Sequence, residues 1–85
     1  MNNAGIMVMI VANSYFVRVL ATPDTELDTL FRIANALKRT KKRGHFLLNW
    51  AIVDRNRDKK KTLADYGLQD GDRCRFYCGV PAYNV

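Results

Sequence analysis

The stretch Lys61-Thr62-Leu63-Ala64-Asp65-Tyr66-Gly67-Leu68-Gln69-Asp70-Gly71-Asp72 decides which fold this sequence predicts. Leu63 to Leu68 indicates a brief turn or a single helical turn. Asp70-Gly71-Asp72 indicates a tight turn, because Gly and Asp are favoured where the chain reverses direction. The segment from Arg73 to Gly79 alternates polar and apolar residues and predicts a final strand.

The residues before this stretch predict a hairpin followed by a helix. Two β-rich runs, Ile6–Ala12 and Tyr15–Ala21, are joined by the short connection Asn13-Ser14. Apolar residues at helical spacing then predict a helix from Glu26 to about Arg39 or Thr40. Its stripe consists of Leu27, Leu30, Phe31, Ala34 and Leu37, with Ile33 at the flank. Thr25 is the expected cap, with Asp28 at the third helical position.

Two further segments complete the predicted order of elements. Phe46 to Val53 is expected to form one strand, and the highly polar segment Asp54 to Lys61 a solvated loop with a short edge strand near it. A hairpin covered by one helix is typical of a two-layer α+β domain. We therefore expect one domain over residues 1–85, with a core at about 6–79 and a short C-terminal tail at 80–85.

The chain resembles the ubiquitin-like β-grasp superfamily. Thr62-Leu63-x-Asp65-Tyr66-x-Leu68 carries the resemblance, and Pro23-Asp24-Thr25 supports it more weakly. The resemblance implies a mixed four- to five-stranded sheet with one main helix on one face and the last strand between the first and the third. It also implies that the Tyr66 side chain hydrogen-bonds local backbone.

Two relatives within the superfamily resemble the chain in particular. The small ubiquitin-like subunit of the minor-spliceosome ribonucleoprotein is similar at His45–Trp50, Asp54–Lys61 and Lys61–Leu68. The ubiquitin-like accessory family of bacterial type VII secretion is similar at Gly44-His45 and Gly67–Arg73. Both resemblances imply a binding function without conjugation.

Composition limits the other function classes. No apolar run reaches the ~18 residues of a membrane span, and the start does not resemble a signal peptide, so we expect a cytoplasmic or nuclear location. Cys74 and Cys78 lie too far apart on one strand to form a disulfide with each other. With the single His45 they are also too few for a zinc site. We expect both cysteines to be buried. His45 has no neighbouring nucleophile in sequence, and the chain lacks a phosphate-binding loop. The sequence predicts a protein that is not an enzyme and needs no cofactor.

The C-terminus bears on conjugation. Ubiquitin-like modifiers need a terminal Gly-Gly, whereas Gly79 stands alone before Val80 and the sequence ends at Val85. A precursor of a conjugated modifier would have to be cleaved after Gly79.

The predicted sheet has one face that a single helix cannot cover. The runs 6–12 and 46–53 are apolar at both odd and even positions. In the second run, one predicted face holds Phe46, Leu48, Trp50 and Ile52, and the opposite face holds Leu47, Ala51 and Val53. We expect an exposed apolar face, which usually marks an interface, either with another protein or with a second copy of the chain. The residues expected to bind a protein there are Met7, Met9, Leu47, Arg75 and Tyr77. The alternative is that loops or the tail, including Tyr83, cover this face.

Ten of the fourteen Lys and Arg residues fall in two runs, in a chain of net charge +6. A nucleic acid is the alternative partner, with phosphate contacts from Lys38, Arg39, Lys41, Lys42, Arg43, Arg55, Arg57, Lys59, Lys60 and Lys61. Each run also has a structural interpretation, as cations at a helix C-terminus and as a solvated loop. The sequence favours a non-conjugated interaction module, which could be a subunit of a ribonucleoprotein. A basic RNA-binding domain and a type VII secretion accessory protein are the alternatives.

Overall fold

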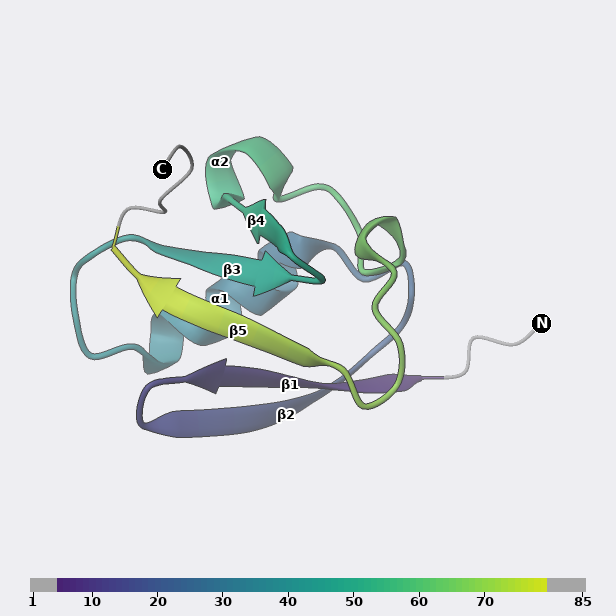
Figure 1. Ribbon diagram of the computed structural model, residues 1–85, viewed down its shortest axis with the longest axis horizontal. Helices are drawn as coiled ribbons and strands as arrows, with labels where there is room; N and C mark the ends of the chain where they lie inside the picture. Colours follow the sequence, from purple (N-terminus) through teal and green to yellow (C-terminus); the bar gives the residue numbers. More distant parts are fainter. Residues whose placement is uncertain (1–4, 80–85) are drawn as a thin grey trace.

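The computed structural model describes residues 5–79, so the predicted tail at 80–85 and Tyr83 lie outside the described residues. Five strands form one mixed sheet, and the main helix lies across one of its faces (Figure 1). The strands are β1 Ile6–Ala12, β2 Tyr15–Ala21, β3 Gly44–Leu48, β4 Ala51–Val53 and β5 Arg73–Cys78. The helices are α1 Leu27–Leu37, α2 Arg55–Asp58 and the single 3₁₀ turn η1 Ala64–Tyr66.

The strand order is β2-β1-β5-β3-β4, so β5 lies between β1 and β3 as the resemblance implied. β1 and β5 are parallel, and the other neighbouring strands are antiparallel. The core lies between α1 and the sheet. Its fully buried members include Val8, Ile10, Leu27, Leu30, Phe31, Ala34, Phe46, Leu48, Val53, Leu63 and Cys74. The predicted mixed sheet with one main helix is confirmed.

The segment before β5 holds the start of α1 in place. The backbone N–H groups of Leu27 and Asp28 donate to the carbonyls of Lys61 and Lys59, at 2.8 and 2.9 Å. The first amides of a helix have no partner within it, and here another backbone segment satisfies two of them. The expected Thr25 cap is wrong: the N-cap is Glu26 without a side-chain cap bond, and Thr25 Oγ1 accepts from the N–H of Thr22 at 3.0 Å.

The turn Asp70-Gly71-Asp72 places β5 beside β1. The N–H of Met7 donates to Asp70 Oδ1 at 2.7 Å, and the N–H of Met9 donates to the carbonyl of Asp72 at 2.9 Å. Gly71 adopts a φ of 90°, a left-handed conformation that favours glycine. The tight turn predicted here therefore sets the parallel register of the two central strands.

The single strand predicted over 46–53 is wrong, because the chain reverses at Asn49 and Trp50. These residues have φ values of 47° and 70° and form the two-residue connection of a β3–β4 hairpin. Two consecutive positive φ values match the twist of a tight hairpin. The turn also changes the alternation, so that Val53 is buried with Phe46 while Trp50 is 93% exposed. The predicted grouping of Trp50 and Ile52 with Phe46 fails for this reason.

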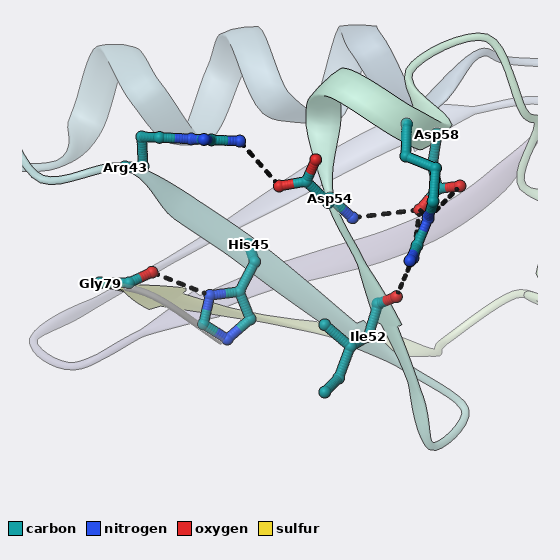
Figure 2. A network of polar contacts seen from close by, with 7 residues as sticks. Arg43, His45, Ile52, Asp54, Asp58 and Gly79 are labelled. Atoms are coloured by element: carbon teal, nitrogen blue, oxygen red, sulfur yellow. Dashed lines mark hydrogen bonds and ion pairs between the residues drawn. The ribbon is translucent and has the colours of Figure 1, made fainter. Parts of the chain in front are cut away.

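The segment 54–61 is not entirely a solvated loop, because it contains α2 and the buried Asp58. The Asp58 carboxylate accepts from the Asp54 N–H at 3.1 Å and from Arg57 at 2.7 Å (Figure 2). Burial opposes ionisation of Asp58, but the hydrogen bonds from Arg57 and Asp54 hold its pKa below the usual value. The carboxylate thus fixes the short helix from inside.

The two cysteines differ, which corrects the expectation that both are buried. Cys74 is buried in the core, and burial raises the pKa of its thiol to about 12. Cys78 is exposed at the end of β5. Within residues 5–79, no helix combines the length and hydropathy that crossing a membrane requires.

Candidate functional site

The strand register defines which side chains share the sheet face opposite α1, here called the outer face. Met9 lies opposite Arg18 on β2 and Arg73 on β5, and Leu47 lies opposite Arg75 on β5. Directly paired residues point to the same side of a sheet. The outer face consists of Met7, Met9, Val11, Phe16, Arg18, Leu20, His45, Leu47, Ile52, Arg73, Arg75 and Tyr77.

The structure brings all five residues of the predicted protein-binding set together on this face. Met7 and Tyr77 are 37% and 43% exposed, and Arg75 is also exposed. Met9 and Leu47 are half-buried between neighbouring strands. The Tyr77 ring stacks on the ring of His45 at 5.7 Å between centroids.

Sequence reasoning missed three large apolar side chains on or beside the outer face. Phe16 and Leu20 on the edge strand β2 are 60% and 71% exposed, and Trp50 is the most exposed of all. The period-two pattern of Phe16, Arg18 and Leu20 was a usable signal for the first two. For Trp50 the signal was Asn49, because Asn tolerates the left-handed conformation at a hairpin turn.

Trp50 borders an open depression of about 710 Å³ on the sheet. Its lining consists of Leu47, Asn49, Trp50, Gly71, Asp72, Arg73, Arg75 and Tyr77. Asn49 Nδ2 donates to the carbonyl of Tyr66 at 2.6 Å, which ties the hairpin turn to η1. The exposed indole therefore stands on a fixed turn next to the predicted binding residues.

The outer face carries arginines that form no ion pair within the described residues. Among the described ion pairs, none involves Arg18, Arg73 or Arg75. The outward positions of the described strands contain no Asp or Glu. Three of the eight acids pair with arginines elsewhere, in Arg32–Asp28, Arg55–Asp28, Arg43–Asp54 and Arg57–Asp58.

The two basic runs lie away from the outer face, in the α1–β3 connection and in the segment around α2. Their ends meet where Arg43 contacts Asp54 at 2.8 Å (Figure 2). Arg55 and Arg57 also contact aspartates, so part of the positive charge of the runs is neutralised. The lysines at 41, 42, 59, 60 and 61 are exposed. Their role toward nucleic acid stays a prediction.

Burial raises the pKa of the Tyr66 hydroxyl, and the Asp58 carboxylate of α2 raises it further. The hydrogen bond from Tyr66 to local backbone stays a prediction. Over residues 5–79, no three His, Cys, Asp or Glu side chains form a group that could hold a metal ion.

Comparison with known proteins gives a family and a fold. The sequence profile of a family described as "Protein of Unknown function (DUF2604)" matches residues 1–74. No curated protein sequence matches the chain.

Solved structures with ubiquitin-like folds match nearly the whole chain. The ubiquitin-like domain of Arabidopsis thaliana protein At2g32350 is 16% identical, with a TM-score of 0.72 over 94% of this chain and 85% of that one. Ubiquitin of Caldiarchaeum subterraneum is 13% identical, with a TM-score of 0.72 over 93% and 99%. The UBL domain of Plasmodium falciparum Dsk2 is 20% identical, with a TM-score of 0.67 over 85% and 95%. The predicted ubiquitin-like β-grasp fold is confirmed; at such identities the likeness establishes the fold alone.

Proposed function

Because this chain belongs to the DUF2604 family and has a ubiquitin-like fold, we propose that it is a non-enzymatic, non-conjugated module that docks a protein partner on its outer face. One observation carries the proposal: α1 covers only one side of the sheet, and the other side displays Met7, Phe16, Leu20 and Tyr77 around exposed arginines.

The chemistry of the outer face supports a protein partner. Met, Tyr, Trp and Arg are enriched at protein interfaces, and each of them is present on or beside this face. Contiguous apolar exposure on a small domain is costly in water and usually marks a binding surface. Tyr77 and Arg75 stand on the central strand β5, where a docked partner would exclude water most completely.

Photo-crosslinking tests the proposal. A photoreactive phenylalanine analogue replaces Tyr77 in one variant and Arg32 in a control, since Arg32 is exposed on α1. We expect the Tyr77 variant to crosslink a defined protein in cells of the source organism, and the control not to. We expect Arg75→Glu or Tyr77→Ala to weaken binding of that protein while the fold remains intact. Equal crosslinking from both positions, or wild-type affinity in both substitutions, would refute the proposal.

A second candidate function is RNA binding through the two basic runs. The Arg43–Asp54 contact supports it, because it brings the end of one run to the start of the other. Replacing Lys59, Lys60 and Lys61 by Gln should then reduce both the RNA affinity and its dependence on salt. Unchanged RNA binding would exclude phosphate contacts by these lysines.

The two family resemblances each propose a cellular assembly in which the module would act. A ribonucleoprotein subunit would combine protein and RNA contacts in the cytoplasm or nucleus, and a type VII secretion accessory protein would use the same docking face elsewhere. A conjugated modifier requires cleavage after Gly79. A measured mass equal to that of a chain ending at Gly79 would identify such a modifier.

A further inference from the structure

We propose that the outer face receives an acidic protein segment that seats a bulky apolar side chain against Trp50. This inference rests on the proposed docking function and names the chemistry of the partner. It depends on two observations, the strained and exposed Trp50 and the arginines beside it, which have no ion-pair partner within residues 5–79.

Trp50 occupies a backbone position that suits glycine. Its φ of 70° is unfavourable for a side chain with a Cβ atom, and the second position of such a hairpin turn favours Gly. The indole is 93% exposed, so it contributes little burial to the fold in return for this strain. Strained conformations of this kind concentrate at functional sites. A large aromatic side chain held rigidly at a hairpin tip is suited to anchor a partner.

Asn49 fixes the turn that carries the indole. The left-handed φ of 47° suits Asn, and its side chain is bonded to the Tyr66 carbonyl. The ring therefore borders the depression lined by Leu47 and Tyr77 without the entropy loss of ordering a mobile loop.

Arg73 and Arg75 line the same depression. Neither has an ion-pair partner among the described residues, and Arg18 adds a third such charge next to Met9. Asp72 also lines the depression, but its carboxylate accepts the N–H of Gln69 at 2.8 Å and serves the turn. Guanidinium groups bind carboxylates through paired hydrogen bonds, so the charge on this face complements an acidic segment.

The side chains of the outer face argue against two other occupants. A second copy docked face to face would bring the face that carries Arg18, Arg73 and Arg75 against an equally basic face, and neither face has Asp or Glu at the outward positions of its described strands. A single-stranded nucleic acid stacks its bases on successive aromatic rings, whereas the aliphatic outward side chains of β1 separate Phe16 on β2 from Tyr77 on β5. An acidic peptide satisfies both the aliphatic centre and the basic side chains.

Selection from a displayed library of random linear peptides tests the inference. The bait is the full chain, and the enriched peptides are measured against Trp50→Gly, the double variant Arg73→Glu/Arg75→Glu, and the control Arg32→Gln. Arg32→Gln removes the charge of an exposed residue on α1. We expect enriched peptides to combine Asp or Glu with a bulky apolar residue. Affinity should fall about tenfold or more in the first two variants and stay unchanged in the control.

Thermal unfolding of each variant separates lost binding from lost folding. Enriched peptides without acidic residues, peptides that bind Trp50→Gly as well as the wild type, or no enrichment would overturn the inference. Displacement of the peptides by a short RNA, with higher affinity for the RNA, would overturn it in favour of a nucleic acid. If Tyr77 crosslinks a protein but the enriched peptides lack acidic residues, only this inference is overturned. If Tyr77 also crosslinks no defined protein, the docking function is overturned as well.

Discussion

Replacing Trp50 with Gly should stabilise the isolated domain, although it removes the largest aromatic side chain. A left-handed φ costs a residue with a Cβ atom about 1–2 kcal/mol, and glycine at a φ of 70° avoids this cost. Glycine gains freedom in the unfolded chain, which offsets about 0.5–1 kcal/mol. Because the indole is 93% exposed, little apolar burial is lost. The net gain is about 0.5–1 kcal/mol, or about 2–8 °C in Tm for a domain of this size.

Urea and thermal unfolding measure the effect, and Gly67→Ala is the matched control. Gly67 has a φ of 68°, and a Cβ atom there would meet nothing closer than Asn49 Nδ2 at 3.7 Å. Gly67→Ala therefore adds the same strain without a clash and should destabilise the domain by about 0.5–1 kcal/mol. A lower Tm for Trp50→Gly, beside a lower Tm for Gly67→Ala, would refute the argument that Trp50 is held at a cost to stability.

Three other predictions concern the core and its polar contacts. The pKa of Asp58 is lowered on folding, so its contribution to folding stability is complete above the ordinary value of 3.8. That contribution is lost as pH falls from 3.8 through the lower pKa of the folded state. Asp58→Asn should cost about 1–3 kcal/mol at neutral pH and show a smaller further loss in acid; parallel curves of Tm against pH for the two proteins would contradict this. Gly44→Ala places a Cβ atom 1.9 Å from Phe76 Cζ and should cost about 1–3 kcal/mol, so an unchanged urea midpoint would count against the observed packing. A thiol reagent should modify Cys78 in the folded protein and Cys74 only on unfolding, and rapid reaction of both would show that β5 is not protected.

Most of the fold could be predicted because its elements have strong local signals. The alternating and β-branched runs identify β1 and β2 with the bounds that the structure has. The apolar stripe identifies α1, although the helix ends at Leu37 rather than at Arg39 or Thr40. The stretch from Lys61 to Asp72 was informative because its backbone satisfies the start of α1 and sets the β1–β5 register.

The errors arise where tertiary contacts override a local pattern. Apolar residues on both sides hide the Asn49–Trp50 turn, because Asn49 is its one signal and no Gly or Pro marks it. The α2 segment looks solvated, since only the fold shows that Asp58 is buried beneath Arg57. Thr25 is a residue type that often caps helices, but the carbonyls of Lys59 and Lys61 accept the hydrogen bonds of the first helix amides instead.

The candidate site was predictable in part for the same reason. Met7, Met9, Leu47, Arg75 and Tyr77 share a face because strand parity and strand order fix it. Trp50 could not be placed with them, because its position depends on a turn that reverses the parity. That Arg73 and Arg75 form no ion pair with the other residues that the structure describes also became visible only in three dimensions.

The most direct test of the docking face is a two-dimensional amide NMR spectrum of the labelled domain, recorded while the crosslinked or selected partner is added. We expect shifts in β5 from Arg73 to Tyr77, in Leu47 and in the Trp50 indole. The segments 38–43 and 55–61 should remain unchanged. Shifts confined to those two basic segments, or to α1, would contradict the claim that this protein acts through its outer face.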